Sequence, residues 1–168
     1  EGERNAYATA PTLGPDGRFH LVWMWRETGD AATNHTLSYA RSGDLIHWED
    51  SRGRPLKLPI TLATSDVVDP APVNGGLINM TMAIGFDAAQ RPVVTYHRYD
   101  EKGNSQVFAA RPRASGGWAA TQVSDWNFRW AFSGGGSLEG EVTAGPVRVE
   151  KDGTLMRSEE HTSELQSR

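Results

Sequence analysis

The feature that most constrains the fold of this chain is a strand-and-turn pattern that occurs twice, 70 residues apart, over residues 13–48 and 84–118. Three pairs of identical residues share this spacing: Ala40 and Ala110, Arg41 and Arg111, and Trp48 and Trp118. A third copy begins at residues 147–155. Self-similarity at such a period, built from short strands and Asp-Gly turns, is typical of a β-propeller with one repeat per blade.

The repeat predicts an all-β chain that is a fragment, about two to three blades, of a β-propeller. We expect residues 1–156 to form this partial propeller, truncated at both ends. Residues 157–168 share neither the repeat nor a strand periodicity, and they resemble a common sequencing adapter translated in frame. We therefore expect a non-native tail there and exclude it from reasoning about the fold.

Composition narrows the functional classes. Of 168 residues, 38% are hydrophobic and 23% are charged, as in soluble globular proteins. No apolar run approaches the roughly 20 residues that span a bilayer, so we expect no membrane partner. The net charge of −4 provides no basic field for nucleic acid. Because Cys is absent, disulfides, thiolate metal sites and Cys nucleophiles are excluded. We see no metal or cofactor motif and expect neither group.

Alternating apolar side chains between turn residues predict the strands. These strands cover residues 18–25, 36–41, 79–84, 92–99 and 106–110. Residues 56–79 hold short apolar stretches broken by Pro and Asp, which indicates a long connection between blades. Residues 126–132 alternate aromatic and polar side chains, as a strand does. No stretch has a helical period.

The segment from Ser42 to Trp48 resembles the Asp-box turn of sialidase-type propellers, in which Ser and Asp bond the backbone of the turn and Trp plugs the space between blades. It is one residue shorter than that motif and lacks its Gly. The segment also resembles a strand-turn of five-bladed glycoside hydrolases that act on furanosides and fructans. Both resemblances imply an architectural role, so we do not expect His47 to be catalytic.

Three further segments resemble the BNR-4 repeat family of propellers, which includes ulvan lyases of the seven-bladed propeller type. These segments are residues 34–42, 55–61 and 96–106, and the resemblance extends over residues 5–156. It implies a carbohydrate-active protein, secreted or periplasmic, with an acidic polysaccharide as its partner. The leading activity that it implies is a polysaccharide lyase that cleaves an ulvan-like, uronic-acid-containing polymer by β-elimination. The fragment alone is expected to be inactive.

β-Elimination at a uronic acid needs a base for the C5 proton, an acid for the leaving oxygen and a cation beside the carboxylate. In ulvan lyases of this kind a His, a Tyr and an Arg occupy the groove, and residues of these types follow in the same order here. The resemblance therefore implies His35 as base, Tyr96 as acid and Arg111 as the partner of the substrate carboxylate. A planar guanidinium can bind a carboxylate with two hydrogen bonds.

Three more residues are candidates for substrate binding: His97, Arg26 and Trp25. Tyr96 and His97 are adjacent, so a regular strand points them to opposite faces. Each catalytic candidate also has a structural interpretation. His35 can serve as a turn residue and Tyr96 as a core residue, and Arg111 can be a solvated strand end because Arg41 occupies the equivalent place one repeat earlier.

Two other functions fit the sequence. A propeller glycoside hydrolase requires two carboxylates roughly 5 to 10 Å apart, and the candidates are Asp30, Glu141 and, as the most concentrated pair, Asp66 and Asp69. A non-catalytic carbohydrate-binding propeller requires only the turns and Trp residues. A sialidase is disfavoured because the three arginines of its carboxylate clamp have no matching positions.

Overall fold

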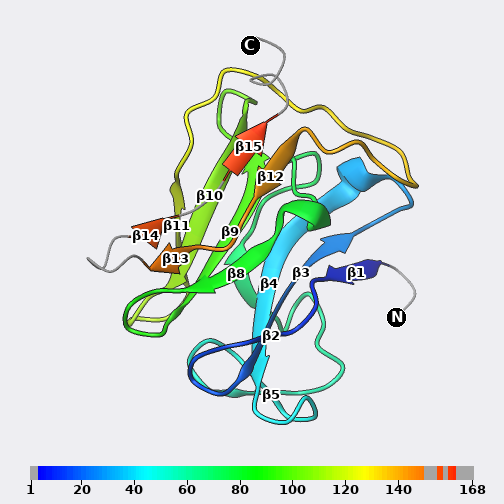
Figure 1. Ribbon diagram of the computed structural model, residues 1–168. Coiled ribbons are helices and arrows are strands. Elements are labelled where there is room, and N and C mark those ends of the chain that lie inside the picture. Colours follow the sequence, from blue (N-terminus) through cyan, green and yellow to red (C-terminus); the bar gives the residue numbers. More distant parts are fainter. Residues whose placement is uncertain (1–3, 150–154, 157–158, 162–168) are drawn as a thin grey trace.

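The computed structural model describes residues 4–149, 155–156 and 159–161. Its first sheet is antiparallel, with strand order β1-β3-β4-β5-β6, β2 paired with β3 and β7 paired with β4. The strands are β1 (Asn5–Ala8), β2 (Thr12–Leu13), β3 (Phe19–Arg26), β4 (Asn34–Ser42), β5 (Trp48–Glu49), β6 (Pro55–Leu56) and β7 (Asp66–Asp69). β3 and β4 form its long central pair (Figure 1).

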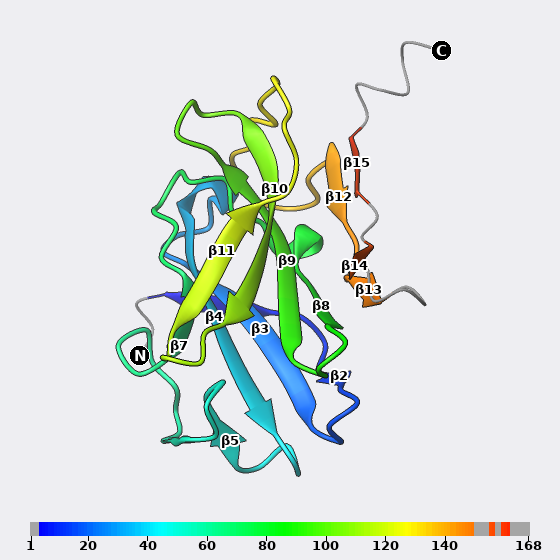
Figure 2. The same cartoon turned by 90° about the vertical axis from the view of Figure 1, so that its left-hand side faces the viewer.

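The second sheet is a four-stranded meander with the order β11-β10-β9-β8. Its strands are β8 (Ala83–Phe86), β9 (Pro92–Tyr99), β10 (Ser105–Pro112) and β11 (Trp118–Gln122). Two short pairs follow beside β8 and β9 (Figure 2), namely β12 (Val142–Ala144) with β15 (Glu159–His161) and β13 (Arg148–Val149) with β14 (Leu155–Met156). Two single-turn 3-10 helices, η1 (Ala31–Thr33) and η2 (Asn79–Thr81), complete the described elements.

The main core lies between the two large sheets, which pack against each other like neighbouring blades (Figure 2). Alternate side chains of each central strand point into this core. The first sheet contributes Val22, Met24, Leu37 and Tyr39, and the second contributes Val94, Tyr96, Phe108 and Ala110. Burying one large apolar side chain stabilises a fold by about 1.5–3 kcal/mol. Separate clusters cover the far faces, with Trp23 and Trp25 on the first sheet and Val107 and Trp130 on the second.

One turn recurs through the molecule and explains why the hairpins form where they do. Among the described residues, five five-residue turns have the same two backbone hydrogen bonds, at residues 14–18, 50–54, 87–91, 100–104 and 113–117. The fourth residue has a positive φ in each: Gly17, Gly53, Gln90, Gly103 and Gly116. Glycine tolerates this conformation, which explains its recurrence. In three turns a leading Asp, at positions 50, 87 and 100, accepts from the third and fifth backbone N–H groups.

The strand predictions are confirmed for β3, β4, β9 and β10, and Trp48 and Trp118 begin the equivalent strands β5 and β11. The prediction for residues 56–79 is wrong over Asp66–Asp69, because β7 pairs with β4 there. Residues 79–81 form η2 rather than a strand. Residues 126–132 form no strand either. The Phe128 carbonyl and the Trp130 N–H are hydrogen-bonded to one residue, Ser105, rather than along the backbone of a neighbouring strand. Residues 159–161, inside the segment expected to be a tail, form β15.

No helix in the described part of the chain is long and apolar enough to cross a membrane.

Candidate functional site

Four loops meet at one end of the molecule and form a surface that we call the rim. They are residues 27–33, 70–78, 100–104 and 125–137. Backbone hydrogen bonds join them, from Ala31 to Gly134, from Asn74 to Ala32 and from Tyr99 to Gly75. The loops meet because β3 and β9 both end at this side, with the 100–104 hairpin at the top of Figure 1.

A β-bulge at Thr36 sets the direction of the His35 side chain. Trp25 pairs with His35 and Met24 pairs with Leu37, so Thr36 is the extra residue of β4. Its φ is 46°, an uncommon conformation for a β-branched side chain. Bulges of this kind redirect side chains and are frequent beside functional sites. Because of the bulge, His35 lies on the face of Trp25, while Leu37 remains in the main core.

The His35 side chain is held by a carboxylate. Its Nε2 lies 2.7 Å from Oε1 of Glu27, and its Nδ1 lies 3.0 Å from the Thr36 hydroxyl. Arg4 donates to the same Glu27 oxygen at 2.9 Å. The Arg4 hydrogen bond, assisted by the one from His35, holds the pKa of Glu27 below its ordinary value. His35 therefore has an ionised partner and remains slightly exposed, at 8%.

Tyr96 lies between the two sheets. The residue is fully buried, and its hydroxyl donates to Oδ2 of Asp69 on β7 at 2.5 Å. Arg98 Nε donates to the same oxygen at 2.8 Å while its guanidinium stacks on Phe108 at 3.8 Å. Burial and the adjacent Asp69 carboxylate raise the pKa of Tyr96 well above its usual range. In this arrangement the hydroxyl connects the sheets and is closed to solutes.

Asp66 and Asp69, the acidic pair of the hydrolase alternative, have structural partners. Val68 is the extra residue of a second bulge, because Asp69 pairs with Leu37 and Val67 pairs with Ser38. Both acids consequently face the second sheet. Asp66 accepts from Trp118 Nε1 at 3.1 Å and from a backbone N–H at 2.7 Å. Asp30 likewise accepts from two backbone N–H groups of the rim.

His97 points away from Tyr96, as strand alternation predicts. Its ring is fully buried among Tyr99, Trp130 and Phe132. Nδ1 lies 2.6 Å from the carbonyl oxygen of Gly76, so this nitrogen carries the proton, and Nε2 has no hydrogen-bond partner among the described residues. Burial lowers the pKa of His97 to about 4.

The remaining candidates are also dispersed. Arg26 is buried between the sheets, where it donates to Asn34 at 2.6 Å and lies 3.9 Å from the centre of the Tyr7 ring. Trp25 is buried on the far face of the first sheet and donates to Ser38. Arg111 is exposed at the end of β10, opposite Ala119. The described residues therefore do not bring the three catalytic candidates into one pocket.

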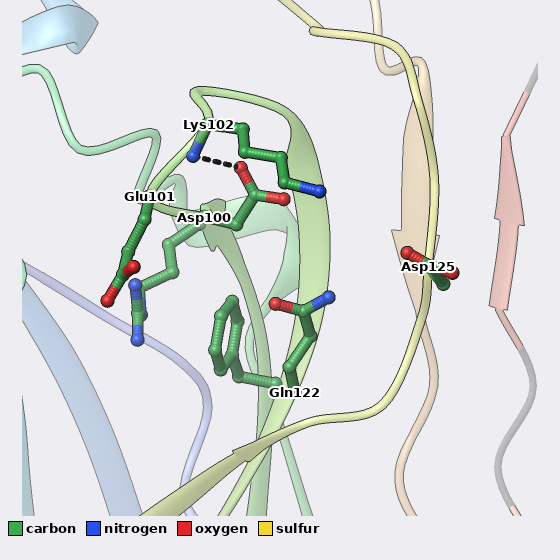
Figure 3. Close-up of a pocket in the computed structure, with 7 residues that line it drawn as sticks. Asp100, Glu101, Lys102, Gln122 and Asp125 are labelled. Carbon is green, nitrogen blue, oxygen red and sulfur yellow. Dashed lines mark hydrogen bonds between the residues drawn. The ribbon is translucent and has the colours of Figure 1, made fainter.

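The cavities of the rim surround the 100–104 hairpin. A cavity of about 310 Å³ is lined by Arg98, Phe108 and Gln122 together with Asp100, Glu101, Lys102 and Asp125 (Figure 3). A neighbouring one of about 490 Å³ includes Trp126 and Phe128. Open sites that mix aromatic faces with charged and amide groups can hold sugars, because rings pack on the aromatics and hydroxyls bond to the polar groups. No sequence motif marks this surface, since its residues come from turns far apart in the chain.

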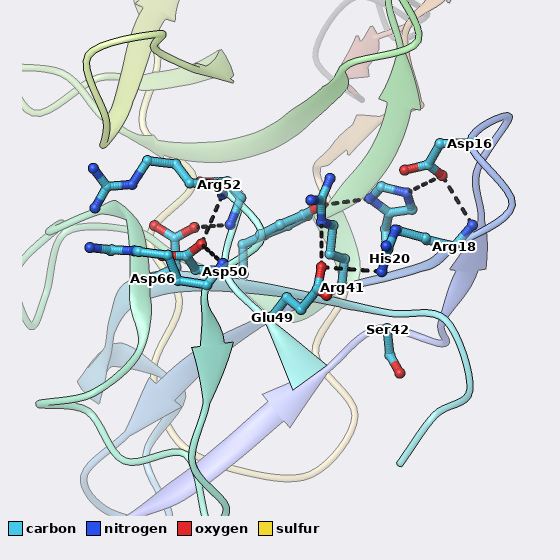
Figure 4. Close-up of polar contacts among 12 residues, drawn as sticks. Asp16, Arg18, His20, Arg41, Ser42, Glu49, Asp50, Arg52 and Asp66 are labelled. Atoms are coloured by element: carbon cyan, nitrogen blue, oxygen red, sulfur yellow. Dashed lines mark hydrogen bonds and ion pairs between the residues drawn. The ribbon is translucent and has the colours of Figure 1, made fainter. Parts of the chain in front are cut away.

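A second polar cluster lies at the opposite end of the first sheet (Figure 4). Buried His20 lies 2.6 Å from the Tyr39 hydroxyl through Nδ1 and 3.0 Å from Asp16 through Nε2. Although partial burial opposes ionisation, hydrogen bonds from His20 and the Arg18 backbone hold the pKa of Asp16 below its usual value. The sequence signal was a lone His on an otherwise apolar strand, next to an Asp-Gly turn. His20 and Tyr39 are fully buried, and Asp16 closes the cluster from an exposed turn, which indicates a structural role.

Side-chain oxygens of Ser42 and Asp44 hold the turn from Ser42 to Trp48. The Ser42 hydroxyl accepts from Asp44 and Leu45, and the Asp44 carboxylate accepts from Ile46 and His47. The contact with His47 is the largest reason why the pKa of Asp44 lies far below its usual value. Exposed His47 thus braces a turn. No cluster of metal-ligating side chains occurs in the part of the chain that the structure describes.

Comparison with known proteins gives a family and a fold. Residues 1–126 match the BNR repeat-containing family. A polysaccharide lyase of family PL25, an ulvan lyase, has a similar structure with a TM-score of 0.61 at 14% identity, covering 94% of this chain and 40% of that chain. A second such structure, with -[GlcA(1-4)Rha3S]- bound, has a TM-score of 0.62 at the same identity and coverage. No curated protein matches the sequence.

The chain thus spans 40% of the length of these lyases. Its two packed antiparallel sheets are part of a β-propeller, as the repeat predicted.

Proposed function

The chain belongs to the BNR repeat-containing family, and from that premise we propose that it is part of a carbohydrate-active propeller whose partner is an acidic polysaccharide. For the full-length protein we propose a polysaccharide lyase acting on a uronic-acid-containing, ulvan-like polymer. Support comes from the likeness to ulvan lyases, one of them with a glucuronate-containing ligand. Since such polymers are too large to enter a cell intact, the protein acts outside the cytoplasm.

The observation that carries this proposal is the His35–Glu27 pair beside a strained bulge. Strain of this kind persists where the surrounding structure over-determines it, and it clusters at active sites. In the proposed reaction, His35 takes the C5 proton of the uronate. The electrons of that bond form the C4–C5 double bond, the C4–O bond breaks, and the leaving oxygen takes a proton. Glu27 orients the ring and stabilises the imidazolium that forms.

Tyr96 and Arg111 stay predictions for the roles of acid and cation, because the first is closed to solutes and the second lies on another face. The separation of Tyr96 and Arg111 from His35 favours one alternative, a propeller that binds acidic polysaccharide without cleaving it. The hydrolase alternative is weaker, because Asp66 and Asp69 both accept hydrogen bonds that join the sheets.

The test uses the full-length protein with ulvan. A lyase increases ultraviolet absorbance, because each cleavage creates an unsaturated uronate. His35→Ala should reduce that rate by about a hundredfold or more, the usual loss when a general base is removed. His47→Ala is the matched control, because His47 is exposed on a turn. New reducing ends without absorbance would favour hydrolysis, and binding without either product would favour the non-catalytic alternative.

A further inference from the structure

The rim contains a stacked pair, Arg129 on Tyr99, and we propose that it is a subsite for one acidic sugar, with the Arg129 guanidinium pairing with a carboxylate or sulfate group. The inference rests on the proposed acidic polysaccharide partner and adds the place where one of its anionic groups binds. Neither residue was a candidate in the sequence. The repeat has no counterpart for this pair, which only the tertiary structure assembles.

The geometry of the pair is fixed from both sides. The Arg129 guanidinium carbon lies 3.8 Å from the centre of the Tyr99 ring. Arg129 Nη1 donates to the carbonyl oxygen of Gly103 at 2.9 Å. The Tyr99 hydroxyl donates to the carbonyl oxygen of Trp130 at 2.7 Å, and its backbone N–H donates to Gly75. An exposed arginine is usually mobile, but these contacts hold its plane in one orientation, so less entropy is lost on binding.

Two glycines make room for the stack. A Cβ on Gly76 would lie 2.8 Å from the Tyr99 ring, and a Cβ on Gly103 would lie 2.8 Å from Arg129 Nη1. Both glycines also have a φ of 84°, which other residues rarely adopt. The backbone therefore approaches the ring on one side and the guanidinium on the other as closely as it can. A side chain at either position would displace the pair.

Cavities flank the pair on both sides and share Asn74, Tyr99 and Arg129 as lining residues. The larger cavity measures about 310 Å³ and extends to Arg98 and the 100–104 hairpin. The smaller one, about 70 Å³, lies toward Phe132. A linear polymer can therefore cross the stack with one sugar in the larger cavity and an anionic group against Arg129.

The charges around the larger cavity favour an acidic sugar over a simple anion. Arg98 is already paired with Asp69, which leaves Arg129 as the exposed cation of this cavity. Asp100 and exposed Glu101 also line it, and carboxylates accept hydrogen bonds from sugar hydroxyls while repelling a bare anion. A ligand with hydroxyls and one carboxylate or sulfate satisfies both sets of groups.

The test measures calorimetric binding of the -[GlcA(1-4)Rha3S]- oligosaccharide to full-length protein carrying His35→Ala, so that the ligand stays intact. Arg129→Ala should weaken binding by about tenfold, the value of one charge-assisted hydrogen-bonded contact at a partly exposed site. Arg129→Lys keeps the charge without the planar stack and should lose several-fold. Arg113→Ala, which removes an exposed arginine from another turn, is the matched control and should leave binding unchanged.

Modified ligands identify the anionic group. If Arg129 pairs with the carboxylate, its substitution has no effect on binding of the carboxyl-reduced oligosaccharide; if it pairs with sulfate, the desulfated form is the insensitive one. Inorganic sulfate should bind weakly to every variant. Gly103→Ala, which leaves Arg129 in the chain but displaces it, should weaken binding as Arg129→Ala does.

The outcomes separate the two proposals. Unchanged binding in Arg129→Ala, with the oligosaccharide still bound, would overturn the subsite and leave the proposed function standing. Absence of oligosaccharide binding in every variant, including the His35→Ala parent, would overturn the acidic polysaccharide partner itself. Circular dichroism of each variant excludes loss of folding as the cause.

Discussion

The hydroxyl of Tyr96 donates a 2.5 Å hydrogen bond to Oδ2 of Asp69, and through it the second sheet is joined to the outer strand of the first. Asp69 is buried, and its other partner at the same oxygen is Arg98, which stacks on Phe108. Trp118 and Asp66 form a similar connection on the same strand. Two carboxylates of β7 therefore hold neighbouring blades in register.

Tyr96→Phe should lower the free energy of unfolding by about 1–2 kcal/mol, because it removes one partner of a buried carboxylate while keeping the ring in the core. Urea denaturation of the full-length protein checks this. The comparison is Tyr99→Phe, because the Tyr99 hydroxyl donates to a backbone carbonyl nearer the surface. Its loss should lower the free energy of unfolding by a smaller amount. A stable Tyr96→Phe protein that has lost lyase activity would instead identify Tyr96 as the catalytic acid.

His97 should make stability depend on pH. Burial lowers its pKa from 6.5 to about 4 in the folded protein, so the unfolded chain takes up this proton first. Neutral His97 contributes fully to the free energy of unfolding above pH 6.5. This contribution, about 3 kcal/mol in total, is lost as the pH falls toward 4.

Urea midpoints measured across that range test the His97 prediction. His97→Phe keeps an aromatic ring among Tyr99, Trp130 and Phe132 but has no group that takes up a proton. The stability of this variant should therefore fall less steeply with acid than that of the wild type. Equal slopes for the two proteins would assign the pH dependence to other groups.

The recurring five-residue turn predicts opposite effects at two equivalent positions. Gly17 has a φ of 74° with open space around it, so Gly17→Ala should cost about 1 kcal/mol through backbone strain alone. Gln90 has a φ of 61° at the same turn position, and Gln90→Gly should raise stability by up to about 1 kcal/mol. Thermal unfolding measures both, and changes of the same sign would contradict the assignment of one turn type.

Gly76→Ala should be more damaging than Gly17→Ala. It combines a φ of 84° with a Cβ that would lie 2.8 Å from the Tyr99 ring, so we expect a loss of about 3 kcal/mol or more from strain and displaced packing. Urea denaturation of both variants in the full-length protein measures the two losses. A loss no greater than that of Gly17→Ala would show that the ring moves freely.

The propeller fold and its main strands could be predicted from local sequence alone. The 70-residue repeat marks equivalent strands, and the two-residue alternation of β3, β4, β9 and β10 assigns one face of each to a core. Turn glycines mark the hairpins, because few other residues adopt a positive φ. The opposite directions of Tyr96 and His97 also followed from alternation.

The site depended on tertiary structure. Bulges at Thr36 and Val68 each reverse the face of the residues beyond them, and no local pattern in the sequence marks an extra residue in a strand. The sequence of β7 consists of two valines between two aspartates, which is too short a pattern to predict a strand. It forms a strand because it pairs with β4. The four long strands β3, β4, β9 and β10 were thus determined by neighbouring residues along the chain. The existence of β7, and the faces that His35, Asp69 and Arg129 occupy, were decided by register and loop contacts between segments far apart in sequence.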